Sequence, residues 1–398
     1  MTDTELPNEI QKFSLVKGGP VYRLFCRSGL CNQDLEPPFR RALVLASIVW
    51  LPLLLLTILG GQFNSGVDIP FLSDIENHVR FLIALPLLLA GETFIHRLLS
   101  PRIRNFVTRN IVREADLPKF RAAIESAHRM RDSRAAEVVI LLVVYAVGAW
   151  IYGGWLASAS AQSPTWYATP DGSKWNLTLA GYWLIAISLP IFQFFLLRWY
   201  FRIIIWAVFL WRVSRLDLNL LATHSDGVAG IGFLNKCAYS FSYGLLAQGA
   251  LLSGYIAGQA VHFGSDPRDH KLEAVGMLLL VLTSILAPLA VFAPRLISAK
   301  WDGGGVYGSL ASRYTQSFDK KWIGEDSLND EPLLGSQDIQ ALADLTNSYQ
   351  VISNMRTVPF STSDVLYFAG MTLAPLLPLL LFIFSLEDLV DRLIKVLI

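Results

Sequence analysis

The chain has 398 residues, of which 53% are hydrophobic and only 16% are charged. A soluble protein of this length needs more polar surface than this composition supplies, so the ordinary soluble globular class is excluded. The net charge of +1 is uninformative as a total, and no feature of the chain indicates a nucleic-acid partner. The apolar residues come in blocks, the first of which, Ala42–Gly60, is long enough to cross ~30 Å of hydrocarbon.

Seven such blocks predict an all-α fold, a polytopic transmembrane helix bundle. Helices are expected because lipid offers no hydrogen-bond partner to backbone N–H and C=O groups. The predicted spans are 42–60, 81–96, 138–157, 179–197, 238–262, 274–293 and 366–385. Residues 1–41 are polar and lack the pattern of a removable signal peptide, so they are predicted to be a cytoplasmic N-terminal segment that stays in the mature protein.

The distribution of positive charge predicts how the chain is threaded. With the N-terminus inside, 27 of the 33 lysines and arginines fall in inner segments and six in outer segments. Cytoplasmic loops of membrane proteins carry such an excess, and one missed span would invert every later loop. The N-terminus is therefore predicted to lie inside and the C-terminus outside.

Two inner regions are predicted to be structured. Within the bundle of spans 1–6 (42–294), the cytoplasmic loop 97–135 contains an amphipathic helix over 116–133, basic enough to lie against an anionic leaflet. The cytoplasmic region 295–365 opens with "KWDGGGVYGS", expected to be a loop, and continues as a helix from Ser336 that Pro359 ends. "STSD" (361–364) is expected to cap the last span. The region is too short for its own core and is expected to pack on the inner ends of the spans.

The last region, 366–398, joins span 7 to an amphipathic helix over 385–398. On the outer side, this helix is interpreted as lying in the membrane interface, and a contact within a homo-oligomer is the alternative.

The fifth span carries a stripe of polar side chains. At 100° per residue, Gln248, Tyr255, Gln259 and His262 share one face, and small residues lie opposite. A polar stripe is costly against lipid, because each buried polar group needs a partner. The functional interpretation is the lining of a hydrated path, and the alternative is hydrogen bonding between helices.

Charged residues within two other spans are further candidates. Glu92 and His96 are spaced i, i+4, as a proton relay or a shared ion would require, although a simple ion pair between Glu92 and Arg97 is the alternative. Arg198 and Arg202 follow the fourth span. We expect that span to end near Leu197, with Trp199 and Tyr200 at the inner interface. An inward shift would bury both arginines as anion or voltage-sensing candidates.

The segment "LLATHSDGVAGIGFLNK" (220–236) brings His224 and Asp226 together with three glycines. Its glycine order fits neither a dinucleotide fingerprint nor a P-loop. The two side chains are expected to point to opposite sides of an extended loop. A joint between two helices is therefore favoured, and the alternative is a cytoplasmic ion or anion site completed by Asp302 of "WDGGG". No metal site or cofactor is predicted. Three cysteines form no disulfide framework and are expected to be free thiols.

The stretches "THSDGVAGIGFL" and "LLGSQDIQALADLTNSYQVI", with the leucine- and proline-rich spans, resemble uncharacterised bacterial multi-pass inner-membrane proteins. The resemblance implies a bacterial inner (plasma) membrane location and no activity. The leading functional hypothesis is small-solute or ion transport through a polar-lined helix bundle. The alternatives are a non-catalytic scaffold or sensor that docks a cytoplasmic protein partner through its inner loops, and a membrane-embedded enzyme, which the absence of a catalytic constellation disfavours.

Overall fold

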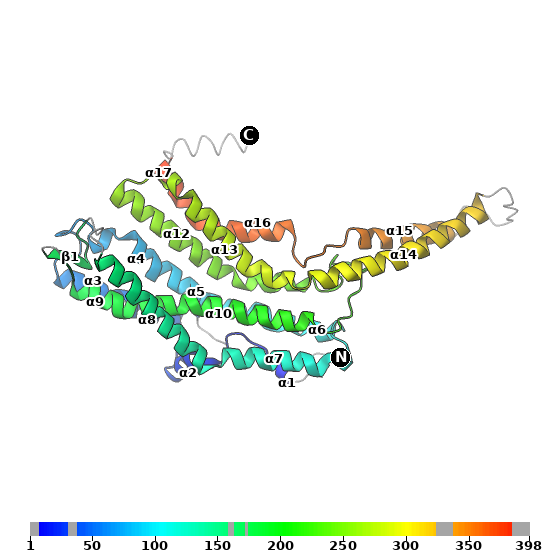
Figure 1. Cartoon of the computed structure of the whole chain (residues 1–398), viewed down its shortest axis with the longest axis horizontal. Coiled ribbons are helices and arrows are strands. Elements are labelled where there is room, and N and C mark those ends of the chain that lie inside the picture. Colours follow the sequence, from blue (N-terminus) through cyan, green and yellow to red (C-terminus); the bar gives the residue numbers. More distant parts are fainter. Residues whose placement is uncertain (1–7, 31–37, 158–162, 172–173, 324–336, 384–398) are drawn as a thin grey trace.

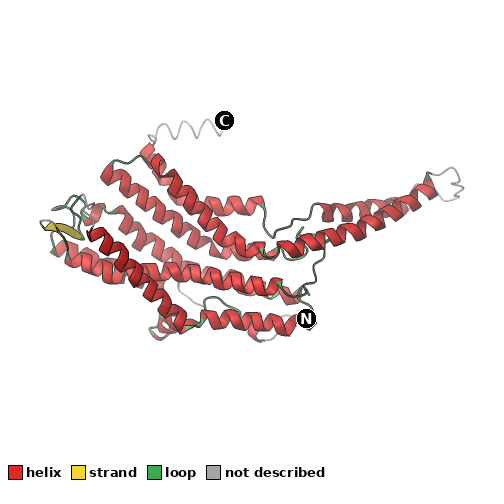
Figure 2. Ribbon diagram, in the orientation of Figure 1, coloured by secondary structure: helices red, strands yellow, loops and turns green. Residues whose placement is uncertain are grey.

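The computed structural model describes residues 8–30, 38–157, 163–171, 174–323 and 337–383, and this part of the chain is mostly helical (Figures 1 and 2). The long helices lie side by side in one elongated bundle, and α14 and α15 project from one end of it. The longer helices are α3 Pro38–Leu59, α5 Leu85–Ile103, α7 Leu117–Arg131, α8 Arg134–Ala157, α10 Leu189–Ser214, α12 Ser242–Phe263, α13 Lys271–Ala290, α14 Ala293–Trp322, α15 Gln337–Ser353 and α16 Thr362–Leu373. The shorter ones are α1 Asn8–Gln11, α2 Gly19–Arg27, α4 Ile75–Val79, α6 Asn105–Thr108, α9 Leu179–Trp183, α11 Phe233–Ala238 and α17 Leu380–Ile383.

Five helical stretches in the described residues are long and apolar enough to cross a membrane. They are Phe39–Leu59, Ile75–Thr108, Leu179–Ser214, Pro267–Ala290 and Thr362–Phe382. A sixth is present if Glu114–Arg131 and Arg134–Trp150, which meet at 44°, form one bent span. The chain is therefore an integral membrane protein of helical class, with exposed leucine, isoleucine and valine side chains along α3, α8 and α13 as lipid requires. Its seven-span topology and orientation stay predictions.

Helix α12, the predicted fifth span, is not among these candidates. It packs against α4, α5 and α16, and glycines allow the close approach. A Cβ atom on Gly244 would lie 1.9 Å from the Trp199 ring, and one on Gly249 would lie 2.0 Å from the Thr372 carbonyl oxygen. Because other helices cover much of its surface, α12 needs less apolar character than a lipid-facing helix.

Two loops, which follow α3 and α8, contact each other at one end of the bundle. Trp166, which is buried, donates its indole N–H to Asp74 Oδ2 at 2.8 Å, and its backbone N–H bonds to the Ile69 carbonyl. A short antiparallel hairpin, β1 Ala168–Asp171 and β2 Lys174–Leu177, follows. This hairpin is a small exception to the predicted all-α fold.

The predicted helix over 116–133 is confirmed as α7, its apolar face is covered by protein, and contact of its basic side chains with an anionic leaflet stays a prediction. Its apolar side chains Phe120, Ile124 and Ala127 are buried against protein, and the Phe120 ring lies 6.1 Å from that of Phe209 on α10. The apolar face that would have entered the interface is therefore already covered.

The inner region 295–365 differs from the prediction in two ways. "KWDGGGVYGS" is helical and belongs to α14, and the α14–α15 hairpin projects away from the spans instead of covering their ends (Figure 1). The predicted helix from Ser336 is confirmed as α15. The predicted cap is confirmed as well: Ser361 and Asp364 form a reciprocal capping box at the start of α16. The predicted amphipathic helix over 385–398 lies outside the described residues.

Candidate functional site

Five charged side chains from four helices meet inside the bundle. Arg41 of α3, Glu92 of α5, Glu137 of α8, and Arg198 and Arg202 of α10 are all buried. Glu92 lies at the centre, 3.1 Å from Arg41 Nη1, 2.5 Å from Arg202 Nη2 and 3.8 Å from Arg198 Nη1. Glu137 Oε1 lies 3.7 Å from Arg198 Nη2. These five residues are called the charge cluster below.

The charge cluster holds one more positive charge than negative. Burial of an ion is costly unless partners and hydrogen bonds replace its water; Glu92 is an ion-pair partner of all three arginines and accepts hydrogen bonds from Arg41 and Arg202. Arg41 also donates to Thr93 Oγ1 at 3.0 Å. Within the described ranges, Arg198 Nη1 and Glu137 Oε1 are buried and have no hydrogen-bond partner. The cluster is thus tightly paired around Glu92 and looser between Arg198 and Glu137.

Residues 14–19 of the N-terminal segment lie over one side of the charge cluster. Ser14 Oγ lies 3.0 Å from His96 Nδ1, and Arg131 donates to the Ser14 carbonyl at 2.7 Å. A Cβ atom on Gly19, which has a φ of +82°, would lie 3.3 Å from Glu137 Oε1. Glycine therefore allows the backbone to lie directly on the Arg198–Glu137 pair.

The predictions for these charged residues need correction. Glu92 pairs with Arg41, Arg198 and Arg202, so neither the Glu92–His96 pair nor the simple ion pair with Arg97 describes its surroundings. Arg198 and Arg202 are buried within one continuous helix, and Trp199, expected at the inner interface, is 1% exposed. The carboxylate of Glu92 offsets the cost that made burial look unfavourable in the sequence.

Three of the four polar side chains of the fifth span contact different neighbours. Gln248 donates to the Tyr200 hydroxyl at 2.9 Å, and His262 Nε2 lies 2.9 Å from the Ser73 carbonyl oxygen. Tyr255 is 36% exposed and meets the His270 ring edge-on, while Gln259 is half-buried. The bonds of Gln248 and His262 are of the kind that was the alternative to a hydrated path, and a path along Tyr255 and Gln259 stays a prediction.

Residues 220–236 form a compact turn centred on Asp226. Its carboxylate accepts hydrogen bonds from the backbone N–H groups of Val228, Gly230 and Gly232. Burial raises the pKa of Asp226, but these N–H groups outweigh burial and hold the pKa below its ordinary value. His224 Nδ1 lies 3.0 Å from Asp226 Oδ1, so the expectation that the two side chains point apart is wrong.

The same turn holds the base of the α14–α15 hairpin. Arg356 donates its backbone N–H to the Gly227 carbonyl at 2.9 Å and its side chain to the Asp226 carbonyl at 3.3 Å. A Cβ atom on Gly303 of α14 would lie 2.5 Å from Ala222 Cβ. The turn is therefore a joint, as favoured in the sequence, and it fixes the hairpin to the bundle.

Asp302 does not join His224 and Asp226 in a shared ion site. It accepts a hydrogen bond from Ser298 at 3.1 Å and lines a cavity of about 370 Å³ with Ala222 and Thr223. In the part of the chain that the structure describes, no three histidine, cysteine or acidic side chains converge as metal ligands. The expectation of free thiols holds for Cys237, which is buried with its pKa raised to about 12, but Cys26 is disulfide-bonded.

No family model, curated protein or solved structure matches this chain. The resemblance to bacterial multi-pass membrane proteins is therefore supported only at the level of a helical protein with several candidate membrane spans. Sequence reasoning found three members of the charge cluster but missed Arg41 and Glu137. Both lie in the first turn of an apolar helix, where a charge is ordinary, and only the packing of α3 and α8 brings them to Glu92.

Proposed function

We propose that this protein is a non-catalytic membrane scaffold whose bundle anchors the α14–α15 hairpin on the cytoplasmic side of a bacterial inner membrane. The observation that carries the proposal is the hairpin itself. It extends from the bundle as two packed helices, and beyond its base no described side chain from Ile297 to Val351 is buried (Figure 1).

The base of the hairpin is rigidly attached, as a docking element requires. Leu296, Ile352 and Met355 are buried there, and Lys300 donates to the Met355 carbonyl at 2.7 Å. Arg295 bonds to the Ser214 carbonyl of α10 at 3.3 Å. A partner bound to the hairpin would therefore be held at a fixed position relative to the membrane.

Charge favours a second copy of this chain as the partner. Helix α14 has five basic and two acidic residues, whereas α15 has two acidic residues and no basic one. When two hairpins lie side by side about a two-fold axis, α14 of one copy meets α15 of the other, so opposite charges face each other. Four helices packed in this way would also cover apolar side chains that a lone hairpin leaves exposed, such as Val306 and Leu310.

The register of the hairpin identifies the pair to test. Lys321 bonds to Asp338, and Gly308 lies beside Tyr349, so Arg313 and Asp344 lie at nearly the same level. Both side chains are exposed. We expect Arg313 of each copy to pair with Asp344 of the other.

The experiment measures the dimer dissociation constant of the purified full-length protein in detergent by native mass spectrometry. The Asp344→Lys change replaces two attractive pairs with two repulsive ones. Exposed ion pairs contribute about 0.2–1 kcal/mol each. The loss of two pairs and the gain of two repulsions should therefore raise the dimer dissociation constant roughly tenfold or more. The double change Arg313→Asp with Asp344→Lys should restore the wild-type constant.

Asp319→Lys is the matched control, because it makes the same charge change at an exposed position on another face of α14. It should leave the dimer intact. A monomeric wild-type protein with normal helix content, or equal weakening by both single variants, would refute the self-assembling scaffold.

Transport past the charge cluster is the second candidate. The unpartnered buried atoms of Arg198 and Glu137 favour it, because intramembrane charges often mark ion paths. Proteoliposomes loaded with chloride test it: we expect anion efflux above that of protein-free vesicles, and Arg198→Gln, a change within the charge cluster, should lower it. Chloride retention equal to that of protein-free vesicles would exclude this route.

A further inference from the structure

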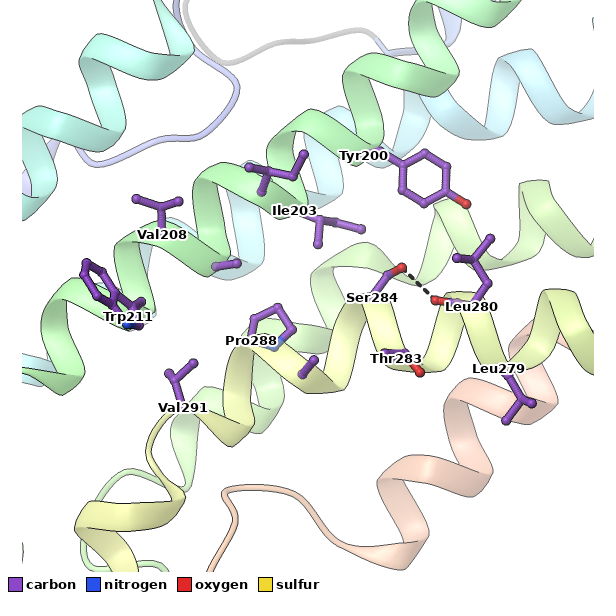
Figure 3. A pocket seen from close by; sticks show the side chains of 13 residues that line it. Tyr200, Ile203, Val208, Trp211, Leu279, Leu280, Thr283, Ser284, Pro288 and Val291 are labelled. Carbon is purple, nitrogen blue, oxygen red and sulfur yellow. Dashed lines mark hydrogen bonds between the residues drawn. The ribbon is translucent and has the colours of Figure 1, made fainter.

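An apolar groove runs between α10 and α13 on the side of the bundle (Figure 3). Its volume is about 830 Å³, and its walls include Tyr200, Ile203 and Trp211 on α10 and Leu280, Ser284 and Val291 on α13. Both walls belong to candidate membrane spans, Leu179–Ser214 and Pro267–Ala290. Leu280 and Trp211 are 58% and 50% exposed, so the groove opens outward.

Two of the three hydroxyl-bearing side chains that line the groove, Ser284 and Tyr200, have hydrogen-bond partners, and the third, Thr283, is exposed. Ser284 donates to the Leu280 carbonyl of its own helix at 2.7 Å, as Figure 3 shows, and Tyr200 accepts a hydrogen bond from Gln248. An apolar chain can therefore fill the groove without leaving these groups unsatisfied.

Three exposed arginines follow the residues at one end of the groove, Trp211 on α10 and Val291 after α13. Arg212 follows Trp211 directly, the Arg215 guanidinium lies 5.1 Å from the Trp211 ring, and Arg295 is bonded to the Ser214 carbonyl. In the described part of the chain, none of the three has a carboxylate at ion-pair distance. Apolar walls that end in unpaired cations match a molecule with a hydrocarbon chain and an anionic head.

We propose that the groove binds one anionic phospholipid, with an acyl chain along α10 and α13 and the phosphate at Arg212, Arg215 and Arg295. The length of the groove matches the thickness of one membrane leaflet. Tyr200 and Trp211 are eleven residues apart on one helix, or about 17 Å, which is close to half of the ~30 Å hydrocarbon core. A chain from one leaflet therefore fills the groove when its headgroup lies at the arginines.

Native mass spectrometry of the full-length protein in detergent tests the proposal. The probes are phosphatidylglycerol, phosphatidylcholine with the same chains, and inorganic phosphate. Phosphatidylglycerol should stay bound at concentrations at which phosphatidylcholine does not, and free phosphate should not displace it. Two variants test the headgroup contact and the acyl-chain contact separately. The triple variant Arg212→Gln/Arg215→Gln/Arg295→Gln removes the cations. Ala287 lines the groove, and Ala287→Trp fills it with a larger side chain.

The triple variant should weaken phosphatidylglycerol binding on the order of 100-fold, from roughly 1 kcal/mol per arginine at a membrane surface. Ala287→Trp should weaken it at least tenfold with all arginines present. Arg129→Gln, on the exposed face of α7, is the control and should bind normally. Helix content and melting temperature report folding for each variant, so loss of lipid can be separated from loss of structure.

Three results would overturn the lipid site. Equal binding of phosphatidylglycerol and phosphatidylcholine would remove the role of the arginines. Displacement by inorganic phosphate, with normal binding by Ala287→Trp, would leave only an anion site without a chain. Unchanged binding by the folded triple variant would place the lipid elsewhere on the protein.

Discussion

Replacement of Glu92 by glutamine should strongly destabilise the bundle. Glutamine keeps the shape of the side chain but removes the charge that three arginines share at 3.1, 2.5 and 3.8 Å. The charge cluster would then hold three guanidinium groups and only Glu137, with a net charge of +2 in place of +1. Removal of one partner of a buried ion pair costs about 3–5 kcal/mol, because the other charge stays buried.

The free energy of unfolding can be measured by reversible unfolding of detergent-solubilised protein in increasing sodium dodecyl sulfate, followed by circular dichroism. Glu125→Gln is the control. It breaks an exposed pair on α7, in which Arg129 lies 3.6 Å away, and should cost less than about 0.5 kcal/mol. A Glu92→Gln variant within 1 kcal/mol of wild type would refute the reasoning. The double variant Glu92→Gln/Arg202→Gln should show a coupling of about 1–3 kcal/mol between the two residues.

Three further predictions concern the joint, the packing of α12 and the buried thiol. The folded-state pKa of Asp226 lies below its unfolded value of 3.8, so its contribution to stability is present above pH 3.8 and is lost as pH falls through the folded pKa. Melting temperatures of wild type and Asp226→Asn should therefore differ most above pH 4 and converge below it. Gly244→Ala should cost at least 2 kcal/mol because its Cβ would enter the Trp199 ring, whereas Gly258→Ala, with open space around it, should be neutral or stabilise the protein by up to about 1 kcal/mol. Cys237, with a thiol pKa of about 12 caused by burial, should resist maleimide at pH 7.5 until the protein is denatured, and peptide mass spectrometry would detect rapid labelling.

Several features of the fold were predictable because they depend on neighbouring residues. Ser361 and Asp364 form their capping box within one turn of chain. The helix α7 was predictable from the helical period of its apolar residues. The period did not indicate that α10 covers this apolar face. The start of α15 was predictable for the same reason.

Helix α14 shows where local preference fails. Three consecutive glycines cost about 1 kcal/mol each in a helix, so Gly303–Gly305 favoured a loop. The helix continues because α15 and Ala222 pack against it, and Gly303 leaves the space that this contact requires. Ile352 and Ala222 are 49 and 81 residues from Gly303 in the chain, so no local pattern indicates these contacts.

The sequence by itself determined the membrane class and most helices, because hydropathy, helical period and capping act over a few residues, and it named Glu92, Arg198 and Arg202 only as separate candidates. Only the tertiary structure decided that Arg41 and Glu137 join Glu92, that Asp226 closes a turn, and that a groove lies between α10 and α13. Convergence of remote charges depends on how helices cross, and the cost of burying each arginine can be judged only when its carboxylate partner is in place.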